Sequence, residues 1–360
     1  MNKRVTICDI AEAAGVSACC VSWVLRNHPR SQGMNVKTRQ RILDAAASLG
    51  YVQNQLAIAT RTGQVNTIAV ILNFRQFQNQ PPVNQIMTGI LLESSAFRQS
   101  IKIFSEEDLD NSFRQILENR IDKIIMISID HDLRERVAEL AEQNSIRLAY
   151  AYECGHRNFP AVNADNIEMT SKMVHYLAEH GHSRIGLLCV PHIHHYKTDR
   201  HAGYLKGMTE CGLKTDPRWI SCSGEIDDAV DRMLALPEGE RPTAMVTLSD
   251  SLAVRAQRQA WKRGLRIPED FSVTGIGNME CSGFNLVPIT TFRESLTETG
   301  NLLVHLVLGK KIDIQPDESQ VFRTHAELIE RESVYPIDAR RKSQAPSYKI
   351  QEKKQKGPAK

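Results

Sequence analysis

The sequence of 360 residues lacks the features that mark several classes of protein. It has no run of eighteen apolar residues, which a membrane-spanning helix requires. Near its start, Asp9 and Glu12 interrupt the apolar stretch that a secretion signal needs. Its eight cysteines include no C-x-x-C pair, and a chain of this length needs no disulfides to hold its core. We therefore expect a cytoplasmic protein, without a membrane partner, whose cysteines are all reduced thiols.

Charge is spread unevenly along the chain. Residues 1–62 carry eight lysines and arginines against three acidic residues, a net +5, and residues 338–360 carry eight against two, a net +6. Because the whole chain is +3, residues 63–337 carry −8. Basic ends around an acidic middle indicate a polyanion as partner, although a solvated basic surface would have the same composition. The low-complexity tail at 338–360 is also typical of a disordered segment.

The first thirty residues predict two short helices joined by a tight turn. Thr6 and Asp9 have the spacing of a helix start, where a hydroxyl caps a backbone N–H and a carboxylate lies near the positive end of the helix dipole. We expect this helix to end at Ala14, with Gly15 in the turn and Ser17 capping a second helix. The pair has the form of a helix-turn-helix, although such pairs also occur as plain packing motifs.

In the second helix, Val21, Val24 and Leu25 share one face, which we expect to be buried. The opposite face carries the candidate DNA readers Ala18, Cys19, Ser22, Trp23 and Arg26. A third helix is expected from about Asn35 to Gly50, with its inward face formed by Ile42, Ala46 and Leu49.

Beyond residue 63, buried strands alternate with helix-like stretches. Alternation of this kind predicts doubly wound parallel sheets with helices on both faces. The expected strands are the β-branched runs at 67–72, 123–129, 147–152, 184–190, 244–248 and 271–277.

Three other classes of protein can be weighed against these patterns. A nucleotide-dependent enzyme needs a glycine-rich phosphate loop after its first strand, and the segment RQFQNQPPVNQ there contains no glycine. A periplasmic binding protein would need an export signal in place of the basic head. A zinc site has four candidate histidines but no standard ligand spacing, so we expect neither metal nor cofactor. Those candidates are His192, His194, His195 and His201.

Several separated motifs resemble the lactose-repressor (LacI/GalR) family. In the head they are VTICDIAEAAGVS, VSWVL, TRQRILDAAASLGY and the segment from Asn54 to Ala57. Downstream they are HGHSRIGLL, RHAGYLKGM, PTAMVTLSD, GLRIPEDFSVTGIG, PITTFRE and AELIERES, so the resemblance reaches about residue 337.

The resemblance implies a homodimeric transcription regulator, most often a repressor, and not an enzyme. An all-α helix-turn-helix headpiece would read a palindromic operator in double-stranded DNA, and a two-lobed domain like that of periplasmic binding proteins would hold a small effector, commonly a sugar or a purine. The alternative is a two-lobed binding protein whose headpiece has lost specific operator reading. The implied parts are a headpiece with hinge at 1–62, a first lobe at about 63–162 and 291–319, a second lobe at about 163–290 and 320–337, and a basic tail at 338–360.

The resemblance also implies the residues that contact DNA. They are Thr6, Ser17, Ala18, Cys19, Ser22, Trp23, Arg26, Arg30, Lys37, Asn54 and Ala57. Two departures bear on base reading, because Cys20 stands where the family usually has threonine and Trp23 where it has an arginine or similar polar residue. In the hinge, Gln53 replaces the family's proline. Thr60 replaces its apolar wedge, which puts intercalation between base pairs in doubt.

In the effector site, Arg200 matches the family's ligand-gripping arginine, whose planar fork suits hydroxyls, carboxylates or carbonyls. The other implied lining residues are Asn73, Asp250, Asn278 and Glu294. A carboxylate that the family often carries after the later strand is missing, because Gly277 stands there. An arginine near an acid is in general more often a structural ion pair than a ligand clamp.

Two side chains of the second helix allow more than one interpretation. Vicinal Cys19 and Cys20 lie near a helix start, where a thiol can sense oxidation, but a small neutral filler beneath DNA is the favoured role. Trp23 is expected to face outward. Its cover would be either DNA, where thymine methyls offer apolar surface, or the loop around Met34.

Overall fold

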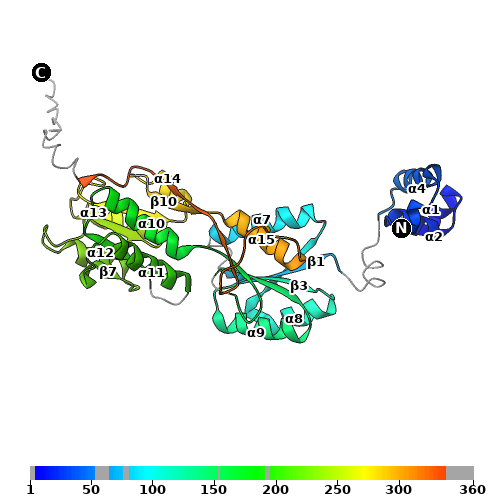
Figure 1. The fold of residues 1–360 in the computed structure, drawn as a ribbon, viewed down its shortest axis with the longest axis horizontal. Helices are drawn as coiled ribbons and strands as arrows, with labels where there is room; N and C mark the ends of the chain where they lie inside the picture. Colours follow the sequence, from blue (N-terminus) through cyan, green and yellow to red (C-terminus); the bar gives the residue numbers. More distant parts are fainter. Residues whose placement is uncertain (1–4, 53–64, 76–80, 153–154, 191–194, 338–360) are drawn as a thin grey trace, which may run out of the picture. The chain divides into compact units, whose positions relative to one another are not determined.

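The structure is a computed structural model that describes residues 5–52, 65–75, 81–152, 155–190 and 195–337. The chain divides into two compact units, 1–65 and 66–360 (Figure 1). Several predictions concern residues outside the described ranges and remain predictions: the hinge with Gln53, Asn54, Ala57 and Thr60, the histidines His192 and His194, and the tail 338–360.

The first unit is a small helical domain. Ile10, Val21 and Ile42 meet in its core and are fully buried, so the apolar face expected for each longer helix does turn inward. Its helices are α1 (Ile7–Ala14), α2 (Ala18–Leu25), α3 (Pro29–Gln32) and α4 (Val36–Ser48).

Local hydrogen bonds fix the start of the first two helices. The Thr6 hydroxyl accepts a hydrogen bond from the Asp9 backbone N–H, and the Asp9 carboxylate accepts one from the Thr6 N–H, which completes a capping box. Gly15 ends α1 with φ 61°, and the Ser17 side chain caps α2 by accepting from the Cys20 N–H at 3.3 Å. These bonds confirm the predicted helix-turn-helix spacing.

The predicted core of the headpiece is wrong at two positions. Leu49 is 38% exposed. Helix α4 ends at Ser48, so Leu49 is its C-cap residue and no longer lies on the inward face of the helix. Tyr51 packs against the core just beyond it. Leu25, the last residue of α2, is only partly buried.

No single helix among the described residues is long and apolar enough to cross a membrane by itself. Helices α1 and α2 pass that test only when taken together, and the chain bends by 106° between them.

The second unit contains two six-stranded sheets. The first has the order β11-β5-β4-β3-β1-β2 and is parallel throughout, and the second has the order β12-β10-β9-β8-β6-β7, with only β12 antiparallel. The strands of the first sheet are β1 (Thr67–Leu72), β2 (Ser100–Ser105), β3 (Lys123–Ile127), β4 (Arg147–Ala151), β5 (Ala161–Ala164) and β11 (Val321–Thr324). Those of the second are β6 (Ile185–Leu188), β7 (Ile220–Ser221), β8 (Ala244–Thr247), β9 (Ser272–Ile276), β10 (Thr290–Glu294) and β12 (Ala326–Ile329).

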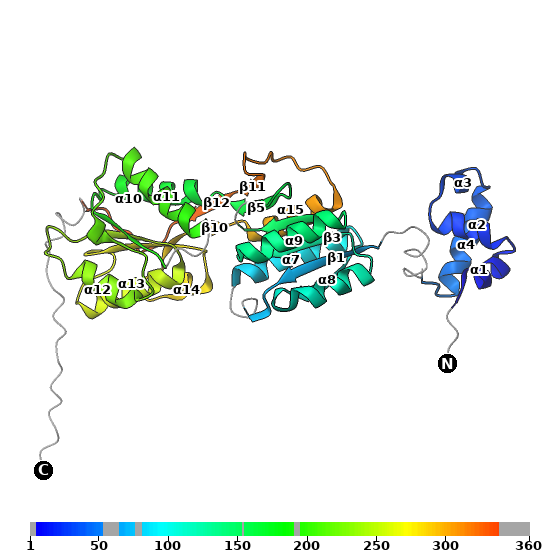
Figure 2. The ribbon, with the colours of Figure 1, turned by 90° about the horizontal axis from the view of Figure 1, so that it is seen from below.

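Helices cover both faces of each sheet (Figures 1 and 2). On the first sheet, α7 and α15 bury one apolar cluster and α8 and α9 another on the opposite face. On the second sheet, α10 and α11 lie on one face and α12 and α13 on the other. The bounds are α7 (Pro81–Ala96), α8 (Leu109–Glu118), α9 (His131–Gln143), α10 (Asn166–Glu179), α11 (His195–Glu210), α12 (Ile226–Leu234), α13 (Asp250–Lys262), α14 (Glu280–Phe284) and α15 (Leu296–Leu308), with short 3-10 turns at Glu106–Asp108 and Pro217–Trp219.

The chain passes between the two lobes a few residues later than the sequence predicts. Strand β10 (290–294) pairs with β9 and β12 in the second sheet, although residues from 291 were expected in the first lobe. Strand β11 (321–324) pairs with β5 in the first sheet, although residues from 320 were expected in the second. In both cases the strand pairs along its length with the sheet that the chain is about to leave, and the chain crosses only after the strand ends. The boundaries between the lobes therefore lie a few residues later.

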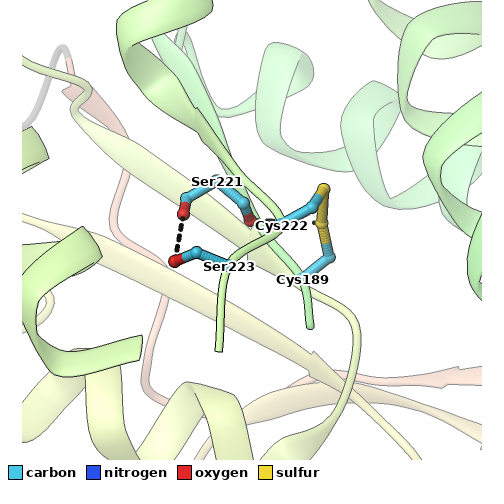
Figure 3. Close-up of a disulfide and its surroundings, with 4 residues drawn as sticks. All are labelled: Cys189, Ser221, Cys222 and Ser223. Carbon is cyan, nitrogen blue, oxygen red and sulfur yellow. Dashed lines mark hydrogen bonds between the residues drawn. A yellow bond between two sulfur atoms is a disulfide. The ribbon is translucent and has the colours of Figure 1, made fainter. Parts of the chain in front are cut away.

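The expectation that all cysteines are reduced is wrong for one pair. Cys189 and Cys222 form a disulfide, although 33 residues separate them in sequence (Figure 3). They meet because β6 and β7 pair side by side and each cysteine directly follows its strand. The structure leaves Cys8, Cys19, Cys20, Cys211 and Cys281 as free thiols.

Candidate nucleic-acid interface and effector cleft

Helix α2 presents most of the predicted DNA readers on its surface. Ala18, Cys19 and Arg26 are exposed, whereas Ser22 and Trp23 are half-buried. The Arg26 guanidinium folds back along the helix, where Nε donates to the Ser22 carbonyl at 2.8 Å and a terminal nitrogen donates to the Ser22 hydroxyl. Because these bonds lie in water, a phosphate or base edge can replace them at small cost.

Trp23 has a partner within the headpiece that sequence reasoning missed. Its indole stacks on His28, with ring centroids 6.3 Å apart and planes inclined by 24°. The Arg30 guanidinium lies 5.5 Å from the ring centroid, at cation–π distance. The short helix α3 thus covers part of the indole, and Met34 packs on the core instead. Trp23 is thus half-buried against α3, and a DNA contact by its free part stays a prediction.

The remaining candidates of the headpiece lie at its surface. Thr6, Ser17, Arg30 and Lys37 are exposed, and the first two already accept capping bonds. The two cations lie in segments that start helices, Arg30 in α3 and Lys37 in α4. Exposed cations of this kind suit phosphate contacts, which position a protein on DNA without reading bases.

In the second unit, Arg200 of α11 is the centre of a buried polar cluster. The residue is only 7% exposed, and all three guanidinium nitrogens have partners. Nε donates to the Asn166 side-chain oxygen at 2.7 Å and Nη1 to the Leu248 carbonyl at 2.8 Å. Nη2 forms an ion pair with Glu294 at 3.1 Å. The cluster joins the start of α10, the end of β8 and the end of β10.

A cavity of about 150 Å³ lies beside this cluster, and side chains of both lobes line it. The first lobe contributes Pro82, Ile129, Tyr152 and Asn163, and the second contributes Asn166, Arg200, Leu248, Ser249, Ile276, Met279 and Glu294. Typical small-molecule sites measure about 300–1,000 Å³. The cavity is therefore smaller than a typical small-molecule site.

Asp250 is close to the cavity without lining it. The residue is fully buried, and its two carboxylate oxygens accept from the Thr291 hydroxyl and the Met279 backbone N–H, both at 2.6 Å. Burial raises the pKa of the Asp250 carboxyl above its usual value, against these hydrogen bonds. Asp250 does not line this cavity, because its strand–helix turn directs the carboxylate beneath the surface, and its contact with an effector stays a prediction. The preceding residue, Ser249, takes the lining position.

Asn278 and Asn73 also point to partners away from the cavity lining. The Asn278 side-chain oxygen accepts from Arg331 at 2.5 Å, and Gly277 before it has φ 124°, a backbone conformation that favours glycine. The Asn73 amide donates to Glu106 at 2.9 Å, at the carboxyl ends of β1 and β2. Of the five predicted effector residues, the structure brings Arg200 and Glu294 together at the cavity.

Asn163 is a lining residue that the sequence did not single out. It lies in β5, immediately before the chain crosses to the second lobe, and is 3% exposed. Its side-chain nitrogen is buried without a hydrogen-bond partner among the described residues, which is costly unless a ligand or water accepts from it. A signal was present, because AVNADN places a polar side chain near the carboxyl end of an otherwise apolar strand.

Comparisons with known proteins agree with both halves of this structure. Residues 6–54 match the family described as bacterial regulatory proteins, lacI family, and residues 174–334 match the periplasmic binding protein-like domain. The chain therefore carries a lacI-family helix-turn-helix domain followed by a periplasmic-binding-like domain. This combination is that of a DNA-binding transcription regulator with an effector-binding domain, and the proteins it is similar to are transcription regulators, not enzymes.

Two similar relatives are named HTH-type transcriptional repressor PurR. The one from Pasteurella multocida (strain Pm70) is 27% identical over 338 residues, which cover 91% of this chain and 98% of the relative. The one from Aliivibrio salmonicida (strain LFI1238) is 27% identical, with 92% and 99% covered.

Solved structures show the same architecture. A lac repressor dimer bound to operator and the anti-inducer ONPF superposes with a TM-score of 0.71 at 23% identity, covering 92% of this chain and all of that one. A LacI-family regulatory protein from Chloroflexus aggregans gives 0.65 at 25% identity, covering 75% and 98%.

Proposed function

We propose that this protein represses transcription as a homodimer on a palindromic operator, and that a small polar effector bound between its lobes changes its operator affinity. The observation that carries the proposal is the cavity lined from both lobes beside the buried Arg200–Glu294 pair. Because a repressor acts on the chromosome, we further propose that it works in the cytoplasm, at the nucleoid.

On the DNA side, α2 is the element that enters the major groove. Its exposed N-terminal residues Ser17, Ala18 and Cys19 are placed for base edges, as the first turn of a recognition helix usually is. Arg30 and Lys37 supply phosphate contacts that set the register. A short, largely uncharged set of readers favours thymine methyls and single hydrogen bonds over a bidentate arginine–guanine pair.

The cavity supports an effector rich in hydroxyl groups, such as a sugar or a derivative of one. Its polar lining consists mainly of neutral groups, among them Tyr152, Asn163, Asn166 and Ser249. Among the described lining residues the one cation is Arg200, which is already paired with a carboxylate, so an anionic effector would have to compete with Glu294. Neutral donors and acceptors pay a smaller desolvation cost than a charged ligand would in so buried a site.

Coupling to DNA follows from where this cluster lies. Glu294 ends β10, one of the strands from which the chain crosses between lobes, and Asn163 belongs to another. A ligand that binds these groups better in one lobe arrangement than in the other shifts the population of that arrangement. The effector then changes operator affinity without touching the headpiece.

An apolar surface on the second lobe supports the homodimer. Trp261, Phe284 and Leu286 are 70%, 81% and 87% exposed, around a hollow of about 700 Å³ between α13 and the segment after α14. Large apolar side chains gathered in this way mark interaction surfaces. We propose that a second copy of the chain covers them around a two-fold axis, which matches the two-fold symmetry of a palindromic operator.

The test is selection of DNA fragments from a random-sequence pool by the purified full-length protein. We expect enrichment of an inverted repeat whose half-sites lie about one helical turn apart, or a multiple of it. The matched control is the chain lacking residues 1–62, which should remain dimeric and enrich nothing. If the full-length protein enriches no sequence over the control, its headpiece does not read an operator and the proposed function is wrong.

A further inference from the structure

Cys189 and Cys222 lie together because of the backbone that carries them. Cys189 follows β6 and Cys222 follows β7, and the Cys189 N–H donates to the Ser221 carbonyl at 2.8 Å, which extends the pairing of the two strands (Figure 3). The two Cα atoms are 4.5 Å apart, within the range that a disulfide spans without backbone movement. Strand pairing sets this approach, so the two thiols are also neighbours in the reduced protein.

The two sulfurs differ in their access to solvent. Cys189 is fully buried, whereas Cys222 is partly exposed and is followed by exposed residues at Gly224 and Glu225. A small oxidant or a reducing thiol can therefore reach the pair through Cys222. The buried partner is held in place to close the bond, an arrangement typical of a reactive cysteine next to its resolving cysteine.

We propose that Cys189 and Cys222 are a reversible redox-modification site that regulates the effector cleft. A DNA-binding regulator works among reductants that keep most thiols reduced, so a pair prepared for bonding there is suited to cycle between dithiol and disulfide. None of the comparisons assigns a role to these cysteines.

The chemistry requires a peroxide as oxidant. The Cys222 thiolate attacks one peroxide oxygen, the O–O bond breaks, and sulfenic acid and water form. The Cys189 sulfur then attacks the Cys222 sulfur, forming the S–S bond and releasing a second water. In total, two thiols and one hydrogen peroxide give one disulfide and two waters. A dithiol reductant returns two electrons and two protons and becomes a disulfide itself.

The bond lies where it can affect the cleft. Cys189 is the first residue after β6, and the next helix in the chain, α11, begins at His195 and carries Arg200. Oxidation links Cys189, at the end of β6, to Cys222, at the end of β7, and restricts this edge of the second sheet, six residues before the start of α11. The reducing surroundings and the effect on effector binding rest on the proposed function. The proximity of the two cysteines and the restriction do not.

The first experiment traps thiols in the native, full-length protein before and after hydrogen peroxide. After peroxide, we expect a single linked peptide pair containing Cys189 and Cys222, and after native treatment with dithiothreitol both cysteines alkylated separately. Cys281→Ser, which removes an exposed free thiol, should behave like the wild type. If the two cysteines stay separately alkylated after peroxide, or remain linked after native reduction, the reversible site is refuted.

The second experiment compares hydrogen exchange of residues 195–210 in the oxidised and reduced wild type. We expect exchange at the start of α11 to be slower in the oxidised form by about threefold or more. Peroxide-treated Cys222→Ser serves as control and should exchange like the reduced wild type. Equal rates in the two wild-type forms refute the link to the cleft. A protein that cycles its disulfide but selects no operator contradicts the proposed function and supports the redox site.

Discussion

The reading face of the headpiece and the effector cleft hold their polar side chains in opposite ways. In the headpiece, the hydrogen bonds between Thr6 and Asp9 and between Arg26 and Ser22 join residues three and four positions apart, and both bonds are exposed to solvent. In the cleft, Arg200 binds partners 34 and 48 residues away and is shielded from water. The first arrangement can exchange its bonds for contacts with DNA. The second is formed within the folded chain, without any partner molecule.

The largest effect is expected from breaking the buried pair. Arg200→Ala leaves Glu294 buried without its cation, which should lower the free energy of unfolding by about 3–5 kcal/mol. The control is Arg255→Ala, which removes an exposed pair with Asp227 and should cost about 1 kcal/mol or less. Urea unfolding of both variants tests the contrast, and equal losses would show that the cleft pair is no more structural than a surface pair.

A smaller effect is expected at the reading face. Trp23→Ala should weaken operator binding by about 1–3 kcal/mol, chiefly at one base pair per half-site, if the free part of the indole contacts DNA. His28→Ala removes the stacking partner and keeps the indole, so it should preserve the base preference. Binding profiles over every single-base operator variant measure this. An unchanged preference for Trp23→Ala would leave the indole as a packing residue only.

A pH-dependent effect separates Asp250 from the exposed carboxyls. Because burial raises its pKa in the folded state, Asp250 binds its proton more tightly when folded than when unfolded. Its contribution to stability is therefore greatest below the unfolded value near 3.8 and is lost as the pH rises through the raised folded pKa. As the pH rises from about 3.8 through the raised pKa of Asp250, the free energy of unfolding of the wild type should fall relative to that of Asp250→Asn. Denaturation of both proteins at a series of pH values measures this difference. A rise in the relative stability of the wild type would show that the pKa of Asp250 is lowered and not raised.

The smallest effect on the operator is expected from the tail. A chain ending at Ile337 loses a net charge of +6, so its affinity for random DNA should fall and its salt dependence should become shallower. The oligomeric state should not change, because residues 338–360 contain no leucine heptad and include Pro346 and Pro358. Binding titrations at several salt concentrations, with sedimentation as control, test both statements. A monomeric product would make the tail part of the dimer.

The contrast between the two regions also explains what the sequence could predict. The six β-branched runs became strands, and the caps at Thr6 and Ser17 formed as expected, because each depends on neighbours along the chain. The two-residue strand β7 and the Cys189–Cys222 bond were missed, since both depend on pairing across 33 residues.

The cleft was predicted only in part for the same reason. Arg200 and Glu294, named through motifs, line the cavity, whereas the Asp250 carboxylate lies beneath its surface, and the contact of all three with an effector stays a prediction. The direction of a side chain at a strand–helix turn depends on φ and ψ of a few residues, which composition does not determine. Asn163 was passed over because it lies within a run that otherwise signals a buried strand.

Gly277 has a consequence for anyone who would retune this protein as a biosensor. A side chain there would adopt a strained backbone conformation, and its Cβ would lie 3.7 Å from an Asp250 carboxylate oxygen. Placing at 277 the acid that the resemblance led us to expect there would therefore set two like charges side by side in a low-dielectric site. Single substitutions at 277 are poor starting points for a library. Neutralising residue 250 first would remove the like-charge repulsion but not the backbone strain at 277.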